Sequence, residues 1–173
     1  MKNIKKVSRI NLAYLLVFVG GVSSSACVQA DSLTASDLMG GQTLALNNAI
    51  VFSPRTHHWS AYGSHGQVVK SGPASGGRGY CPDIHRSCHT PVGVFHIQSM
   101  GGASCRSTRY PKPHGGAPMP YCMFFSKNYA LHGSNDVPNY NASHGCIRLR
   151  TSDAQWMNHN FAHTGTTVVV ESY

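Results

Sequence analysis

The residues best suited to chemistry gather in one stretch, YALHGSNDVPNYNASHGCIRLR, from Tyr129 to Arg150. Two histidines, His132 and His144, and one cysteine, Cys146, stand there among glycine, serine, asparagine and proline. Three kinds of site use these residue types: a metal site, a disulfide anchor, or a nucleophilic thiol beside its base. The spacing and the rest of the chain have to separate them.

A metal site is the first alternative, because histidine and cysteine are both competent zinc ligands. Eleven residues separate His132 from His144, and one separates His144 from Cys146. Zinc sites use closer pairs, Cys-x2–4-Cys or His-x3–5-His, and a fourth ligand would have to come from elsewhere. The spacing therefore disfavours zinc, and we expect no metal and no cofactor.

The first thirty residues are typical of a secretory signal peptide. A basic head precedes an apolar run and a small-residue cleavage site: Lys2, Lys5, Lys6 and Arg9, then Ile10–Val19, then Val28-Gln29-Ala30 before Asp31. The run is too short to span a bilayer, which disfavours an uncleaved anchor. A lipoprotein signal acylated at Cys27 is a third alternative, although Ser24 stands where a large aliphatic residue is usual. We expect an exported chain in the periplasm or cell envelope, with no membrane span in its mature form.

The charge of the mature chain is mildly positive. The full chain has 14 Lys and Arg against 6 Asp and Glu, and the signal removes four cations, leaving 10 − 6 = +4. The cations are scattered, and no basic run is interleaved with aromatic residues, so a nucleic-acid partner is disfavoured. A positive field would suit a substrate that carries carboxylates.

The cysteine count bears on the second alternative, a disulfide anchor. The mature chain keeps five cysteines, an odd number: Cys81, Cys88, Cys105, Cys122 and Cys146. In an oxidising compartment we expect four to pair and one to stay free, although the sequence does not fix which. The short segment with Pro82 between the first two favours a local pair, and the next two would then bracket a Pro/Gly-rich loop. That pairing leaves Cys146 as the free thiol.

The third alternative is a nucleophile, and the residues around Cys146 suit it. Gly145 permits a tight turn, so that backbone amides near Cys146 can point at a developing oxyanion. His132 ends a predicted strand, and the polar loop between could fold back to place it beside the sulfur. For the remaining histidines we expect ordinary surface or packing roles: His57, His58, His65, His85, His89, His96, His114, His159 and His163.

The elements that must position these residues are mostly strands. Short β-branched and aromatic runs alternate with glycine-rich breaks, which predicts strands near 49–53, 57–63, 67–72, 90–97, 121–125, 129–132 and 166–170. Ser152 followed by Gln155 predicts a helix cap, with a short helix over 153–161. We expect a mainly β domain over 49–172, a sandwich or partly closed barrel with one or two short helices. A loose arm precedes it over 31–48, and the long loop 99–120 interrupts it.

Three segments resemble one known family, the L,D-transpeptidases of the YkuD (ErfK/YbiS/YcfS/YnhG) type. His132-Gly133 and Ser143-His144-Gly145-Cys146-Ile147-Arg148-Leu149 are similar to its catalytic signature. Thr90-Pro-Val-Gly-Val-Phe-His-Ile97 and Met119-Pro-Tyr-Cys-Met-Phe-Phe125 are similar to two further family segments. The resemblance covers about 49–171. It departs from the family in a short loop between His132 and Cys146 and in the lack of a separate peptidoglycan-binding module.

The resemblance implies a YkuD-like β-sandwich and an exported enzyme of peptidoglycan. Cys146 would attack the third residue of a stem tetrapeptide and release D-alanine, and an amine of a second stem peptide would resolve the thioester into a 3→3 cross-link. His132 would be the base, oriented by the carbonyl of Gly133. Carbapenems would act as acylating inhibitors.

The resemblance also assigns supporting roles. Backbone amides at Gly145 and Cys146 would form the oxyanion hole, and Ser143 and His144 would support the site. Arg148 and Tyr121 would position the substrate, Arg148 by pairing with a stem carboxylate. The loop 99–120 would be a lid, braced by a disulfide between Cys105 and Cys122.

Two other functions stay open at this point. The same thiol and histidine could use water as acceptor, giving an L,D-carboxypeptidase or endopeptidase. A non-catalytic wall-binding or metal-binding protein belongs to another class, and it has no need of a free thiol beside a histidine.

Overall fold

The computed structural model describes residues 48–173. The expected signal peptide over 1–30, the alternative acylation site Cys27 and the arm over 31–48, apart from Asn48, lie outside the described residues. Within the described part, no helix is long and apolar enough to cross a membrane.

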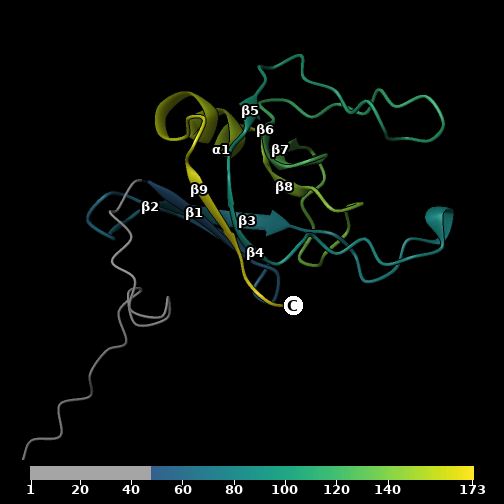
Figure 1. Cartoon of the computed structure of the whole chain (residues 1–173), viewed down its shortest axis with the longest axis horizontal. Coiled ribbons are helices and arrows are strands. Elements are labelled where there is room, and N and C mark those ends of the chain that lie inside the picture. The colour runs from purple at the N-terminus through teal and green to yellow at the C-terminus, as the bar shows by residue number, and fades with distance from the viewer. Residues whose placement is uncertain (1–47) are drawn as a thin grey trace, which may run out of the picture. The chain divides into compact units, whose positions relative to one another are not determined.

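Nine strands form the framework of residues 48–173 (Figure 1). Their bounds are β1 Ala49–Ser53, β2 His58–Tyr62, β3 Val68–Ser75, β4 Gly93–His96, β5 Ser99–Met100, β6 Met123–Ser126, β7 Tyr129–Ser134, β8 Ile147–Arg150 and β9 Thr167–Val170. They pair in the order β4-β9-β1-β2-β3-β8-β7-β6-β5. The pairs β1/β9 and β7/β8 are parallel, and the other pairs are antiparallel.

The long strand β3 joins the two halves of the sheet. Its first part pairs with β2, from Val68 opposite Tyr62 to Pro73 opposite His58, and its end pairs with β8 at Ala74 and Ser75. The sheet curls enough for strands from opposite ends of the order to meet, because the ring of Phe95 on β4 lies 5.4 Å from that of Phe125 on β6. The expectation of a mainly β, YkuD-like fold with short helices is confirmed.

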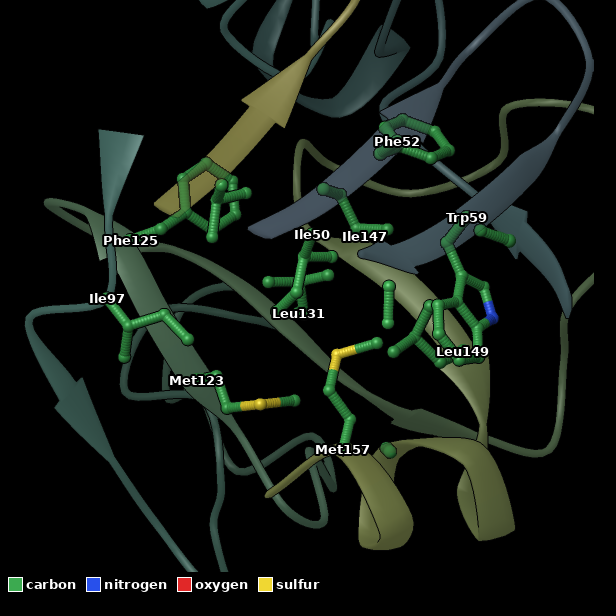
Figure 2. Close-up of a cluster of buried hydrophobic side chains, with 14 of the residues drawn as sticks. Ile50, Phe52, Trp59, Ile97, Met123, Phe125, Leu131, Ile147, Leu149 and Met157 are labelled. Atoms are coloured by element: carbon green, nitrogen blue, oxygen red, sulfur yellow. The ribbon is translucent and has the colours of Figure 1, made fainter. Parts of the chain in front are cut away.

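The larger of two hydrophobic clusters in the described residues forms the main core, which Figure 2 shows in close-up. Its largest fully buried side chains come from six strands, from the residue after β4 and from the helical segment η3 (Met157–Phe161): Ile50, Phe52, Trp59, Ile97, Met123, Phe125, Leu131, Ile147, Leu149, Met157, Val168 and Val170. Burying each such side chain stabilises the fold by about 1.5–3 kcal/mol. The strands that carry the functional stretch, β7 and β8, are therefore held on one face by the core itself.

The helix differs in its start from the sequence prediction. Helix α1 runs over Thr151–Trp156 and continues as one π-helical segment, η3, over Met157–Phe161. The residue before it is Arg150, which has an extended backbone and makes no side-chain cap. Because strand β8 leads straight into the helix, Ser152 already lies in the first helical turn, and the predicted capping box is wrong.

Several strands also differ from the prediction. Strand β3 continues to Ser75, where its end pairs with β8, and β4 begins only at Gly93. Strands β5 and β8 were not expected, and β5 lies at the start of the expected loop 99–120.

We expected a strand to end at His132, but β7 continues to Ser134, because Gly133 and Ser134 still pair with β8. The strand expected over 121–125 begins at Met123, because Tyr121 has a left-handed backbone with φ of 57°.

Both expected disulfides are present. Cys81 pairs with Cys88 and Cys105 with Cys122, and among the described residues Cys146 is the free cysteine. The first bond closes a loop over 81–88, the cysteine loop, which contains the short 3-10 helix η2 at Pro82–Ile84. The second ties the base of the lid loop, residues 99–120, to the residue before β6.

Candidate active site

The parallel pair β7/β8 brings His132 and Cys146 to one face of the sheet. Leu131 lies opposite Ile147 and His132 opposite Arg148. Extending this register by one residue places Cys146, just before β8, opposite Ala130. Side chains alternate between faces along a strand, so the positions of His132 and Cys146 are diagonal neighbours on the face away from the core.

The turn that presents Cys146 is closed by a serine. Ser143 Oγ donates to the carbonyl of Cys146 at 2.5 Å and accepts from the N–H of Gly145 at 2.9 Å. Gly145 has φ of 122°, and a Cβ on it would lie 2.4 Å from the Tyr129 ring. The turn therefore needs glycine both for its backbone angle and for the ring packed against it.

His132 is held in one tautomer. Its Nδ1 lies 2.9 Å from the carbonyl oxygen of Gly133, and because a carbonyl can only accept, Nδ1 carries the proton and Nε2 is left as a base. Burial lowers the pKa of His132 below its ordinary value, the Gly133 contact works against that, and the charge of Arg148 lowers it further. The imidazole is therefore neutral near pH 7 and able to accept a proton.

The thiol of Cys146 is also neutral at rest. Burial raises its pKa, while a backbone hydrogen bond from Ala130 and the charge of Arg148 act in the opposite direction. Its Sγ lies 3.7 Å from the carbonyl oxygen of Asn128, a weak contact for an S–H donor. A neutral thiol becomes a good nucleophile when a base removes its proton, which is the capacity that His132 offers.

The side chains of His132 and Cys146 both line a cavity of about 540 Å³. Its walls are the cysteine loop, the lid loop, the β6–β7 turn and the ends of β7 and β8. In Figure 1 the cysteine loop and the lid loop project to the same side of the sheet. The lining is cationic, with one carboxylate, Asp136, against five basic side chains: Arg86, Arg106, Arg109, Lys127 and Arg148. Such a cavity attracts ligands that carry carboxylates.

The lid loop is anchored at its base, where Met119 is buried against Cys122 and Ala130. The disulfide of Cys105 and Cys122 fixes it on one side, and the Gly133 N–H donates to the carbonyl of Pro120 at 2.7 Å. Gly133 therefore contacts both the lid loop, through its N–H, and His132, through its carbonyl.

Of the other predicted site residues, some lie at the cavity and Tyr121 does not. Arg148 lines the cavity, but its Nη1 already pairs with Asp136 at 2.6 Å. The amide of Gly145, expected in an oxyanion hole, donates to Ser143 Oγ at rest. Tyr121 is not brought to the cavity: it packs against the core, with its ring edge-on to His159 at 5.3 Å.

His144 has partners that no sequence pattern indicates. Its Nε2 lies 3.0 Å from each carboxylate oxygen of Asp83, in the cysteine loop, and its ring lies 4.5 Å from that of Tyr110, in the lid loop. Lone Asp and Tyr residues in polar loops carry no sequence signal for such contacts. Among the described residues Cys81, Asp83 and His144 also form a group with metal-binding side chains, but the Cys81 sulfur is committed to its disulfide, which leaves two ligands.

Comparisons with known proteins agree with this geometry. The family model of the YkuD L,D-transpeptidase catalytic domain matches residues 47–170. No curated protein matches the chain. Among solved structures, an L,D-transpeptidase from Xylanimonas cellulosilytica matches with a TM-score of 0.62 and 23% identity over 75% of this chain.

Two further structures match with TM-scores of 0.58 and 23% identity. One is L,D-transpeptidase 3 from Mycobacterium tuberculosis in complex with a faropenem-derived adduct, covering 72% of this chain and 60% of that one. The other is an L,D-transpeptidase in complex with imipenem, covering 71% of this chain and 58% of that one. The chain spans 62% of the Xylanimonas structure, and at these identities the likeness shows a shared fold.

Proposed function

The chain belongs to the YkuD family of L,D-transpeptidase catalytic domains, and from this premise we propose that it cross-links peptidoglycan stem peptides through a thioester on Cys146. One observation carries the proposal: the free thiol and a histidine with its Nε2 available share one face of β7/β8 and one cavity. A binding protein has no use for this pair.

In the first step His132 Nε2 takes the thiol proton, and the Cys146 sulfur attacks the carbonyl of the third stem residue. The C–S bond forms as the bond to D-alanine breaks, and the protonated His132 gives its proton to the departing amine. The oxyanion formed on the way lies by the amides of Gly145 and Cys146. Since Gly145 N–H donates to Ser143 Oγ at rest, it must share or exchange that bond to serve the oxyanion.

The basic lining supports a carboxylate-bearing donor peptide. Arg148 is already paired with Asp136, which is largely exposed, so a substrate carboxylate can replace that partner at little cost. In the second step the amine of another stem peptide attacks the thioester, giving a 3→3 cross-link. We place this reaction outside the cytoplasmic membrane, in the periplasm or cell envelope, where the signal peptide would send the chain.

β-Lactams of the carbapenem type should acylate the same thiol. The relatives with imipenem and a faropenem-derived adduct share the fold, and a strained lactam carbonyl offers Cys146 the same electrophile as a stem peptide. Acylation would then report on Cys146 and His132 without requiring an acceptor.

The test is to incubate the purified mature chain with disaccharide-tetrapeptides and to analyse the products by mass spectrometry. Dimers that have lost D-alanine are expected. Tripeptides alone would show that water is the acceptor, which replaces the transpeptidase by a carboxypeptidase. Cys146→Ala should abolish both the dimers and the carbapenem adduct without unfolding the domain. If the wild-type chain gives neither product nor adduct, the proposal fails.

A further inference from the structure

A second histidine, His144, lies in the same cavity with a carboxylate behind it. Two residues before Cys146, it lines the cavity and contacts both oxygens of Asp83 at 3.0 Å through Nε2. Its side chain is 27% exposed, so a ligand in the cavity can reach it. The proposed acylation step makes no use of this pair.

Two loops that are far apart in the sequence, the cysteine loop and the lid loop, both contact His144. Asp83 lies 61 residues before it, on the loop that the Cys81–Cys88 disulfide closes, and the Tyr110 ring from the lid loop tilts by 31° over the imidazole. Because a carboxylate accepts, Nε2 carries the proton and Nδ1 keeps its lone pair. The arrangement is that of a base oriented by a carboxylate, which also stabilises the imidazolium that forms.

The second half of the reaction needs a base of this kind. An acceptor amine arrives as an ammonium group at neutral pH, and it has to lose two protons as it becomes an amide. Cys146 takes back one, through His132, when its sulfur leaves. The other proton needs a second acceptor.

We propose that His144, oriented by Asp83, is the catalytic base that takes the first proton from the incoming acceptor ammonium. The inference rests on the proposed function. The freed amine attacks the thioester carbonyl, the C–N bond forms, the C–S bond breaks, and the second proton returns to the Cys146 sulfur. His144 then releases its proton to solvent, so the net products are the amide, the thiol and one proton.

The two histidines thus divide the reaction between them. His132 is buried and held by a carbonyl, and it serves the sulfur. His144 is partly exposed at the cavity wall, and we assign it to the acceptor. The hydrogen bond from His144 holds the pKa of Asp83 below its ordinary value, with help from Arg78, so Asp83 stays ionised behind the imidazole.

The experiment separates the two half-reactions on the full mature chain. The rate of thioester formation with a disaccharide-tetrapeptide is followed by mass spectrometry, and then its decay with two acceptors: a stem-peptide amine, charged at the assay pH, and hydroxylamine, which is largely uncharged there. The variants are His144→Gln and Asp83→Asn. His65→Gln, at an exposed turn, is the matched control.

We expect His144→Gln to slow transfer to the stem peptide by about a hundredfold, the usual worth of a general base, while acylation and transfer to hydroxylamine stay near wild type. Asp83→Asn should show the same pattern with a smaller loss, and His65→Gln should change nothing. Asp83 is an exposed loop residue, so this variant keeps the test valid if His144→Gln does not fold.

Three outcomes would overturn the inference. Transfer to the stem peptide could be unchanged, or acylation could fall as much as transfer, or hydroxylamine could lose as much as the stem peptide. A Tyr110→Leu variant with the same selective loss would also overturn it, because a mere tie between the loops would then explain the effect. If no thioester forms on the wild-type chain, the proposed function itself has failed.

Discussion

Two regions of the molecule place side chains in the same cavity by different physical means. His132 and Cys146 stand on or beside β7 and β8, whose other face is buried against the core at Leu131 and Ile147. Asp83 and Tyr110 stand on exposed loops that two disulfides close. The sheet positions the thiol of Cys146 and the imidazole of His132, and the two disulfides position the loops that form the cavity walls.

The difference follows from what each region can bury. A strand that shares the core cannot shift without exposing apolar surface, so the thiol and its base keep their register. The lid loop is rich in glycine and proline and has no buried residue over 101–118, so a disulfide supplies an anchor by restricting its unfolded states. Acylation of Cys146 should therefore respond to changes in the strands, and substrate binding and acceptor transfer should respond to changes in the loops.

The largest effect should come from the strand side. His132→Gln keeps a hydrogen-bonding side chain but removes the base, so carbapenem acylation of Cys146 should slow by about 10²–10⁴-fold with little change in KM for the donor. Stopped-flow acylation measures this, and thermal melting should show the domain still folded. A rise in the KM for the donor as large as the fall in the acylation rate would mean that His132 also binds substrate. The distinction between strands that set acylation and loops that set binding would then fail.

Gly145 lies where the two regions meet, and it offers the next largest effect. Gly145→Ala forces an alanine to φ of 122° and a Cβ to 2.4 Å from the Tyr129 ring, a strain of about 1–3 kcal/mol that falls directly on the turn before Cys146. Acylation should slow roughly tenfold or more. The matched control is Gly66→Ala, which has φ of 76° and open space around it, far from the cavity in sequence and on the β2–β3 turn. Equal losses in the two variants would show that general strain, and not the turn, matters.

The strand side could be predicted from sequence, and the loop side could not. The β periodicity predicted the strand of His132, and the His-Gly and Ser-His-Gly-Cys segments indicated His132 and Cys146, because these depend on local patterns. Strand β8, after Cys146, was not predicted. The contacts of His144 with Asp83 and of Arg148 with Asp136 depend on where exposed loops fold back, and no local pattern encodes them.

Tyr121 shows the limit of a local pattern. A tyrosine in a family-like segment is expected at the substrate, whereas in the structure Tyr121 has a left-handed backbone and packs against the core and His159. The helix cap failed for a related reason. Ser152 and Gln155 have the right spacing, yet a strand that continues to Arg150 leaves no turn for the cap to close.

Breaking the lid disulfide should have a smaller effect, on substrate binding and stability rather than on acylation. Cys105→Ala with Cys122→Ala opens a bond between residues 17 apart, which should lower the free energy of unfolding by about 3 kcal/mol. KM for the donor peptide should rise several-fold, while acylation by a small carbapenem stays nearly unchanged. Denaturant unfolding and steady-state kinetics measure the two effects. The matched pair Cys81→Ala and Cys88→Ala should instead slow acceptor transfer, because it loosens Asp83.

The smallest effect is expected from mild acid. Burial and the Arg148 charge place the pKa of His132 below the ordinary value of 6.5, so its basic form persists to lower pH than that of a free imidazole. An unperturbed histidine would lose about three-quarters of its neutral form at pH 6, whereas carbapenem acylation should lose less between pH 7.5 and 6. As the pH falls below about 6.5, His132 is protonated in the unfolded chain but stays neutral in the folded protein. The free energy of unfolding should therefore decrease with falling pH until folded His132 is protonated as well. An acylation profile with its midpoint at or above 6.5 would contradict a buried His132, and with it the claim that the sheet, and not the solvent-exposed loops, sets the acylation chemistry.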